Sequence, residues 1–556
     1  MDFRHNHFTI VLGAFLTSLY VFSARVDAAT TINARSPSFA DVATAVTTAQ
    51  DGDTVSVPAG SATWTTALTI SKGITLQGAT RITTNTSAHP PTYGISPDSA
   101  STVITTNVTV ITAHVPSGKI FRVSGFTFRQ NGTPGSGQTI TINGSGTTYA
   151  DVSRIRTDNC YFASLRNTCN IFVTGWAYGV VDHCIFDVIG NGGASVRVFH
   201  DSWNRSQHGW GSWADDPYWG SDRFIFIEDC VMNNLTSAVE RGSIDSKQGG
   251  RYVARHNWFH GCNLNPHGTE ESGGVAERGV KQTEVYQNYF SPSTSNPHPG
   301  SGQQRGGTIL LHDNQYVGYG GATALTLYRR YQFDLGNSGS KNTPTQFAWC
   351  GGSGFSPWDC NATELDQSHV DGHPPYVFNS GKHTGANGYL GIVDTSKNWI
   401  PGQWKGFSVQ NTNPSSVYFN GFNRIYDNTA TELIIHGSPP LGPDCRWNAG
   451  DSYRIGKCIR AIDQGGSGKS DPLQNNQLTN PPYPKWLNQG REPAYSWNNT
   501  LDGRAINFQN DPGNPLDVLS AGIDYINGIP KPGYTPYTYP HPLTGPLPPT
   551  NLTVTQ

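Results

Sequence analysis

The chain has 556 residues, of which 63 are Gly and 36 are Pro, and only 14% are charged. This composition excludes a mainly helical protein, because the strong helix formers are scarce. The 14 Trp, 24 Tyr and 24 Phe residues exclude a disordered chain, since they offer extensive apolar surface for burial. A net charge of -3 gives no electrostatic reason to expect nucleic acid or an anionic membrane surface as a partner.

The first 28 residues have the pattern of a secretory signal peptide. Arg4 precedes the apolar run 8–22, and the small-residue cleavage pattern 26–28 follows it. No other apolar stretch approaches the roughly 18 residues that a membrane span requires. We therefore expect a secreted protein without a membrane span, in a compartment where disulfides can form.

Behind the signal peptide, the sequence predicts one short helix followed by short strands. Ser38 can cap an amphipathic helix that continues to Ala49, with apolar residues recurring on one face. Segments 51–60 and 68–78 alternate turn residues with β-branched and apolar residues, which predicts strands. A helix in this position would cap the open end of a solenoid.

A repeat fills the middle of the chain and predicts a stack of β coils. Its loose template is apolar-x-apolar-x-x-(Cys/Asn)-x-aromatic, with 24 to 46 residues between successive Cys/Asn positions. This period suits one coil of a parallel solenoid, in which stacking makes the core continuous. Asn at a repeated bend tolerates the left-handed conformation and can bond to the next coil. The six Cys/Asn positions are Cys160, Cys184, Cys230, Asn257, Asn288 and Asn314.

Two segments near the start carry a family resemblance. Residues 50–60, with Gln-Asp-Gly-Asp-Thr-Val and Pro-Ala-Gly, and residues 70–78, with Ile-Ser-Lys-Gly-Ile-Thr-Leu-Gln-Gly, resemble the opening of secreted proteins of the pectate-lyase-like superfamily. The resemblance covers roughly residues 36–330 and implies an all-β, right-handed parallel β-helix. It leaves the activity open, because the superfamily includes lyases, hydrolases, esterases, epimerases and non-catalytic adhesins. The Arg-x-Pro-x-x-Arg motif of pectate lyases is absent.

The nine cysteines divide into three groups by their place in this pattern. Three lie in the repeated column, where we expect buried free thiols. Cys169 and Cys262 remain unassigned. The expected disulfides join cysteines of loop-like segments: Cys350 with Cys360, and Cys445 with Cys458.

The repeat fades after about residue 330, and we expect a small β insertion before the chain returns to the solenoid near 494–499. The last residues are Pro-rich and resemble a linker entering a truncated fibronectin-type-III-like module, which would serve attachment. The predicted parts are a signal peptide (1–28), a parallel β-helix (29–394), a small β insertion (395–460), C-terminal coils with an extended tail (461–545), and the linker or module start (546–556).

Acidic residues stand two positions before the first three column positions, and we call Asp158, Asp182 and Glu228 the acidic row. Arg255 takes this place in the fourth coil. Alternate residues of a strand point to opposite faces, so these side chains should share an outer face. Stacked carboxylates repel one another unless a cation compensates, and Ca²⁺ accepts such oxygen ligands. The alternative is a solvated row neutralised by arginines: Arg154, Arg156 and Arg223.

The loop at 265–279 carries a second candidate group. His267 can act as a general base near neutral pH, oriented by Glu270 or Glu271. Arg278 can bind a substrate carboxylate in a bidentate fork. The alternative is a Gly-rich loop whose side chains satisfy backbone carbonyls. Three residues that lie one coil earlier could share this face: Arg251, Arg255 and His256. We expect Arg251 and Glu270 to contact the substrate.

The long loop of the 46-residue coil contains a cluster of tryptophans. Flat aromatic surfaces beside a cleft stack well on sugar rings, so we expect this loop to bind substrate. The alternative is a self-packed loop that covers the solenoid. The four residues are Trp203, Trp210, Trp213 and Trp219.

These patterns together predict a secreted, polysaccharide-active lyase that cleaves an acidic glycan by β-elimination. The acidic row would hold Ca²⁺, His267 or Arg255 would remove the proton, and Arg278 would neutralise the substrate carboxylate. A non-catalytic glycan-binding or surface-assembly protein is one alternative. Another is a glycoside hydrolase that uses carboxylates such as Asp182, Glu228 or Asp245.

Overall fold

The computed structural model describes residues 29–130, 137–146, 151–165, 169–188, 193–200, 211–235, 242–268, 270–272, 275–297, 299, 302–320, 324–325, 378–405, 407–419, 422–435, 446–456, 463–468, 490–509, 519 and 521–545. The predicted signal peptide, the terminal linker, Trp203, Trp210 and the four cysteines of the expected disulfides lie outside these residues.

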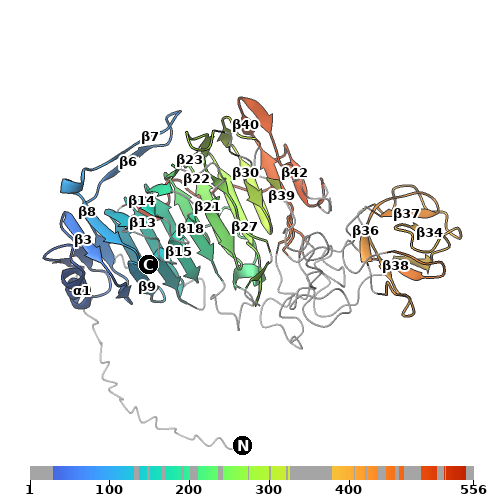
Figure 1. The fold of residues 1–556 in the computed structure, drawn as a ribbon, viewed down its shortest axis with the longest axis horizontal. Helices are drawn as coiled ribbons and strands as arrows, with labels where there is room; N and C mark the ends of the chain where they lie inside the picture. The colour runs from blue at the N-terminus through green and yellow to red at the C-terminus, as the bar shows by residue number, and fades with distance from the viewer. Residues whose placement is uncertain are drawn as a thin grey trace, which may run out of the picture.

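The coils of the chain stack along one axis and form three long sheets of parallel strands (Figure 1). The repeat predicted this parallel solenoid, and the fold is the right-handed parallel β-helix that the family resemblance implied. Sheet A contains β1 (Thr31–Asn33), β2 (Thr54–Ser56), β5 (Thr75–Gln77), β10 (Ile120–Ser124), β13 (Ser153–Asp158), β16 (Ala177–Asp182), β19 (Ile225–Glu228), β22 (Arg251–Arg255), β27 (Gln282–Tyr286), β30 (Thr308–His312), β39 (Ala494–Trp497) and β42 (Tyr525–Asn527).

Each coil passes from sheet A to sheet B and, in the first part of the chain, on to sheet C. Sheet B contains β3 (Gly60–Trp64), β8 (Thr102–Thr106), β11 (Phe126–Gln130), β14 (Tyr161–Leu165), β17 (Ile185–Val188), β20 (Val231–Asn234), β23 (Trp258–His260), β28 (Tyr289–Ser291), β31 (Gln315–Tyr316), β40 (Asn499–Leu501) and the antiparallel β41 (Arg504–Ile506). Sheet C contains β4 (Leu68–Ile70), β9 (Ile111–Val115), β12 (Gln138–Gly144), β15 (Cys169–Gly175), β18 (Ala194–Phe199), β21 (Gly242–Lys247) and β24 (Asn263–Leu264).

Helix α1 (Phe39–Thr48) lies at the N-terminal end of the solenoid (Figure 1), as the sequence predicted. The Ser38 side chain accepts the Asp41 N–H, which satisfies one of the free donors of the first turn. Buried Val42, Ala45 and Val46 join the solenoid core. None of the helices in the described part of the chain is long and apolar enough to cross a membrane.

The repeated column forms the bend between sheets A and B. The Asn257 side-chain amide donates to Asn288 Oδ1, and Asn288 donates in the same way to Asn314. Asn499 continues this ladder, because it accepts from Asn314 while β39 pairs with β30. The predicted return to the solenoid is therefore confirmed. The left-handed backbone was expected in the column itself, but it falls one residue earlier, at Asn159, His183, Asp229, His256, Gln287, Asp313 and Asn498.

Residues two positions after the column stack inside the solenoid. Phe162 lies 4.8 Å from Phe186 between ring centroids, and Phe290 lies 4.4 Å from Tyr316. These rings belong to a single hydrophobic core that runs through the coils. Such stacking explains why the template demands an apolar residue there, since an isolated coil cannot bury its inner face.

A separate antiparallel sheet forms the insertion, and it begins earlier than residue 395. Two of its strands precede that position, because β33 pairs with β38 and β34 pairs with β37. In spatial order its strands are β33 (Asn379–Lys382), β38 (Ser452–Gly456), β35 (Ser408–Asn411), β36 (Phe422–Asn428), β37 (Glu432–Ile435) and β34 (Ile392–Val393).

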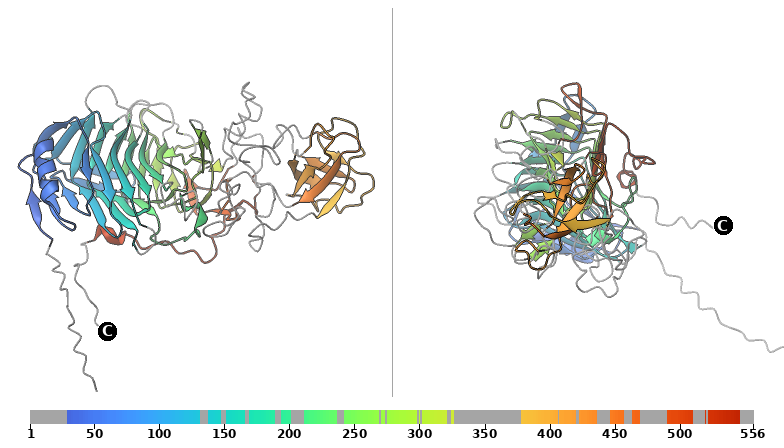
Figure 2. Two further views of the ribbon diagram at one scale, coloured as in Figure 1. Left: turned by 90° about the horizontal axis from the view of Figure 1, so that it is seen from below. Right: turned by 90° about the vertical axis from the view of Figure 1, so that its right-hand side faces the viewer.

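Two segments outside the coils lie against the solenoid. One is the antiparallel arm of β6 (Ile82–Asn85) and β7 (Thr92–Ile95), which Figure 1 shows reaching from the first coils toward β23. The other is the tail 531–545, which runs back along the stack from the last coils toward the early ones (Figure 2). The remaining short elements are η1 (Asp98–Ala100), η3 (Gly211–Ala214), β25 (Glu270–Ser272), β26 (Val275–Glu277), β29 (Gln303–Gln304), β32 (Ala324–Leu325) and η6 (Pro542–Thr544).

Candidate functional site

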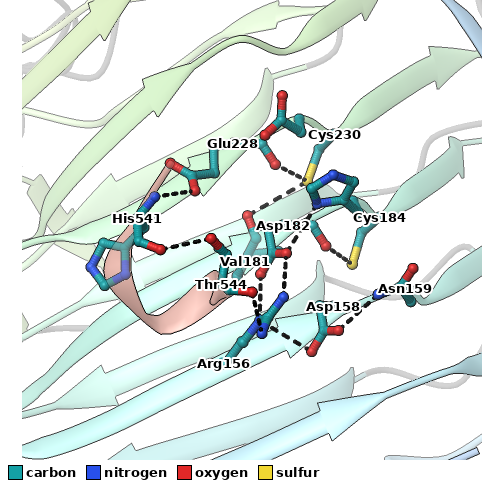
Figure 3. A network of polar contacts seen from close by, with 12 residues as sticks. Arg156, Asp158, Asn159, Val181, Asp182, Cys184, Glu228, Cys230, His541 and Thr544 are labelled. Atoms are coloured by element: carbon teal, nitrogen blue, oxygen red, sulfur yellow. Dashed lines mark hydrogen bonds and ion pairs between the residues drawn. The ribbon is translucent and has the colours of Figure 1, made fainter. Parts of the chain in front are cut away.

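The acidic row lies on the outer face of sheet A as expected, but each of its carboxylates is paired with an arginine. Figure 3 shows one of these pairs, Arg156 with Asp182, and the contact of Glu228 with His541. Arg156 Nε and Nη2 donate to the two oxygens of Asp182 at 2.9 and 2.8 Å. Arg255 Nη2 lies 2.7 Å from Glu228 Oε2. Arg122 binds both oxygens of Asp158 at 2.6 and 2.7 Å. Neutralisation by arginines agrees with the alternative interpretation of this row, but of the three arginines expected there only Arg156 pairs with it, and the carboxylates are buried rather than solvated.

The tail covers this row. The backbone N–H of His541 donates to Glu228 Oε1 at 2.9 Å. Arg255 donates to the carbonyls of Tyr537 and Thr538 at 2.7 and 2.8 Å. Arg156 reaches the carbonyl of Leu543 at 2.9 Å. These hydrogen bonds use the remaining capacity of the arginines to hold the tail against sheet A.

This arrangement does not fit a Ca²⁺ ion. A calcium site needs several oxygen atoms that converge on one point, whereas every oxygen of the three carboxylates already accepts a hydrogen bond from an arginine or a backbone N–H. Burial opposes ionisation of Asp158, yet Arg122 and Arg156 hold its pKa below the usual value. Within the described part of the chain, no group of three or more His, Cys, Asp or Glu side chains is placed to hold a metal.

Arg278 is also unavailable for the role expected of it. Its side chain is fully buried, and its Nε and Nη2 bind the Asp463 carboxylate at 2.7 to 2.9 Å. The ring of Trp213 packs over this guanidinium at 4.5 Å. Arg278 therefore joins a segment far along the chain to the solenoid, and a substrate carboxylate would have to displace Asp463 from a desolvated pair.

The other predicted binding residues that the structure describes have packing roles. Trp213 is buried and donates to the Gly279 carbonyl at 2.8 Å. Trp219 is half-buried and donates to Glu492 Oε1 at 2.8 Å. Buried Arg251 donates to the carbonyls of Ser212 and Asp216, so it holds the same loop. These contacts agree with the alternative of a self-packed loop that covers the solenoid. The Glu270 side chain lies outside the described residues.

The outer face of sheet C carries a group of polar and aromatic side chains that reaches solvent. On β21, Ile244 points into the core, and Asp245 and Lys247 point outward. Register pairs Asp245 with Arg197 and Lys247 with Phe199 on the neighbouring β18. One strand further, Phe172 of β15 lies beside Arg197. Outward side chains of neighbouring strands therefore lie beside one another in two rows that cross the sheet. One row contains Phe172, Arg197 and Asp245, and the other contains Phe199 and Lys247.

His267 joins this face through the backbone of the chain that follows β24. Its N–H donates to the Ser246 carbonyl at 2.8 Å, which places it beside Asp245. His267 Nε2 lies 3.5 Å from Asp245 Oδ1, with side chains 24% and 7% exposed. The second oxygen of Asp245 accepts from Arg197, whose Nη2 is 2.6 Å away. The buried Asp245 carboxylate thus lies within ion-pair distance of an imidazole that remains partly accessible.

Two cations and two aromatic rings complete this group, which we call the sheet C cluster: Phe172, Arg197, Phe199, Asp245, Lys247 and His267. The Phe199 ring meets Phe172 edge-on at 5.1 Å. Lys247 Nζ lies 5.3 Å and Arg197 Cζ 5.5 Å from the centre of the Phe199 ring. Phe199 is buried, so of the two rings only the half-buried Phe172 is partly accessible. An aromatic ring beside two positive charges and a base is suited to an anionic ring with an acidic C–H.

The sheet C cluster and the acidic row do not form one site. The acidic row ends the strands of sheet A at the bend toward sheet B. Asp245 lies instead on β21 of sheet C, and the chain then enters β22 of sheet A, which begins at Arg251 and ends at Arg255. The length of β22, roughly 13 Å, therefore lies between the sheet C side of the coil and the end of sheet A that carries the acidic row. His267 and Arg278 therefore do not act together with the acidic row on one substrate group.

Sequence reasoning singled out His267 and Asp245 but missed Arg197, Lys247 and both phenylalanines of the cluster. The available signal was the alternation of apolar and polar residues in segments 194–199 and 242–247, which predicts outward side chains once the coil register is extended to a third sheet. Comparison with known proteins adds no assignment, because no protein-family model and no curated protein matches the chain.

Proposed function

We propose that this protein is a secreted enzyme of the pectate-lyase-like superfamily that cleaves an acidic polysaccharide by β-elimination at the sheet C cluster. The observation that carries the proposal is the accessible His267 imidazole beside buried Asp245, with Arg197 and Lys247 next to it. Export rests on the signal pattern of residues 1–28. Superfamily membership rests on the parallel β-helix and the resemblance of residues 50–60 and 70–78.

In the proposed reaction, neutral His267 removes the proton from the carbon next to the uronate carboxylate. Asp245 keeps the ring oriented and stabilises the imidazolium that forms. Negative charge develops on the substrate carboxylate, and Lys247 and Arg197 stabilise it electrostatically. The C–H electron pair forms the new carbon–carbon double bond, the glycosidic C–O bond breaks, and the leaving oxygen takes a proton from the imidazolium or from water.

The test is an assay of the full chain on a panel of uronate-containing polysaccharides, followed by the ultraviolet absorbance of unsaturated products. We expect His267→Ala to lower turnover by about 100-fold or more, because a positioned base contributes roughly this factor. His260→Ala is the matched control, since His260 is half-buried on sheet B and bonds to Ser291. It should leave turnover unchanged.

Three results would contradict the proposal. Saturated products would indicate hydrolysis, and binding without any product would indicate a glycan-binding protein. Turnover that survives His267→Ala would place the base elsewhere. In each case the thermal unfolding temperature of the variant must match that of the wild type, so that loss of folding is not mistaken for loss of chemistry.

A further inference from the structure

A cavity lies at the bend between sheets A and B, and none of the residues of the sheet C cluster lines it. Its volume is about 290 Å³, close to the lower end of small-molecule pockets. His256, Gln287 and Asp313 occupy equivalent positions on three successive coils and form its floor. The residues that line it are Thr86, Ser87, His89, His256, Gln287, Asn288, Tyr289, Asp313 and Gln315.

The roof of this pocket comes from the connection between β6 and β7. Thr86 Oγ1 donates to Asp229 Oδ1 at 3.1 Å, and the His89 ring lies 5.0 Å from the Tyr289 ring. The tail closes one side, where the Tyr539 ring stacks on His256 at 3.7 Å. The Tyr539 hydroxyl donates to the same Asp229 oxygen at 2.9 Å. Three segments distant in sequence thus hold the walls in place.

The chemistry of the lining is polar and almost entirely uncharged. Burial, followed by the charge of Arg255, lowers the pKa of His256 to about 4, so this imidazole is neutral at physiological pH. Its buried Nε2 has no hydrogen-bond partner among the described residues. The hydrogen bond from His312 Nδ1, at 2.7 Å, lowers the pKa of Asp313. The Asp313 side chain is still 41% exposed, so it can accept further hydrogen bonds from a ligand.

We propose that this pocket binds one uncharged sugar ring of a glycan. A sugar ring offers hydroxyl groups that both donate and accept, which matches the carboxylate, the amides and the neutral imidazole. The Tyr289 and His89 rings supply the flat surface that its C–H face requires. None of the nine lining residues is Lys or Arg, and Asp313 repels a carboxylate, so the pocket disfavours uronates. Its specificity is therefore opposite to that of the sheet C cluster.

The experiment titrates the full chain with methyl glycosides of neutral hexoses and, separately, with methyl glycosides of uronic acids, followed by saturation-transfer NMR and calorimetry. We expect a neutral glycoside to bind, and Asp313→Asn and Gln287→Ala each to weaken that binding by about tenfold, as the loss of a charged or multiple hydrogen bond does. Asp98→Asn, at an exposed carboxylate paired with Arg129, is the matched control and should have no effect.

Two outcomes would overturn the inference: no neutral glycoside binds, or its binding is unchanged in both pocket variants. The second outcome would place the binding elsewhere on the chain. The result is separable from that of the lyase assay, because His267→Ala should leave neutral-sugar binding intact. Binding that fails in His267→Ala but persists in Asp313→Asn would assign the sugar to the sheet C cluster.

Discussion

The outer faces of sheets A and C carry similar charged side chains in different states. On sheet A, Arg255 and Glu228 are both fully buried and covered by the tail. On sheet C, Arg197 and His267 keep about a quarter of their side-chain surface exposed. A buried pair that has no remaining hydrogen-bond capacity stabilises structure, whereas a partly exposed group next to a base can meet a substrate. The tail that covers sheet A therefore distinguishes the two faces.

Breaking a pair on sheet A should have the largest effect. Arg255→Met leaves Glu228 buried without its cation, and we expect a loss of about 3–5 kcal/mol in the free energy of unfolding. Urea denaturation measures it. Arg129→Met is the matched control, since its pair with Asp98 is exposed and should cost less than about 1 kcal/mol. Equal losses in the two variants would contradict the division between the two faces.

A second effect concerns Glu284, which is buried on sheet A and accepts from the Gly220 N–H and the Tyr534 hydroxyl. Burial raises its pKa to about 7. The folded chain thus keeps a proton that the unfolded chain releases above its ordinary pKa of 4.5. Stability from this group is therefore fully present below pH 4.5 and falls as the pH rises to about 7, by up to roughly 3 kcal/mol.

The measurement compares urea denaturation of the wild type and Glu284→Gln between pH 4 and 8. We expect the difference between them to change in favour of the variant as the pH rises, because glutamine remains neutral in this place. The charge of Arg255 lowers the pKa of Glu284, so Arg255→Met should raise that pKa further and enlarge the pH dependence. A difference that stays constant over this range would show that Glu284 ionises normally.

The smallest effect is expected on sheet C. Lys247→Met removes a charge that stabilises the substrate carboxylate as its negative charge grows in our proposal, so kcat/KM should fall about tenfold with the unfolding temperature unchanged. Lys247→Arg retains the charge and should recover most of the loss. An unchanged kcat/KM in Lys247→Met, or a loss of stability as large as in Arg255→Met, would make the two faces alike.

The solenoid itself was predictable from local pattern. The Cys/Asn column, the ring two positions later and the Ser38 cap each depend on short-range periodicity, and all three occur where expected. Such patterns can be recognised in the sequence because each coil makes the same contacts with its neighbours, so the same residue types recur at the same positions. The roles of Arg278 and Arg255 were not predictable in this way, since their partners, Asp463 and the tail carbonyls, lie 185 and about 280 residues away along the chain.

By itself, the sequence determined the β-helix, its inward column and which residues face outward, because alternation within a strand and the period of the coil are local properties. Only the tertiary structure decided which outward face is covered. The tail returns over sheet A and desolvates the acidic row, and the arm folds over the bend to enclose a pocket. Neither the tail nor the arm has a periodic pattern in its sequence, because each is a single segment that does not repeat from coil to coil. Because the tail covers sheet A, the carboxylates that were predicted to bind a metal form buried ion pairs instead. Partly exposed charged groups lie on sheet C.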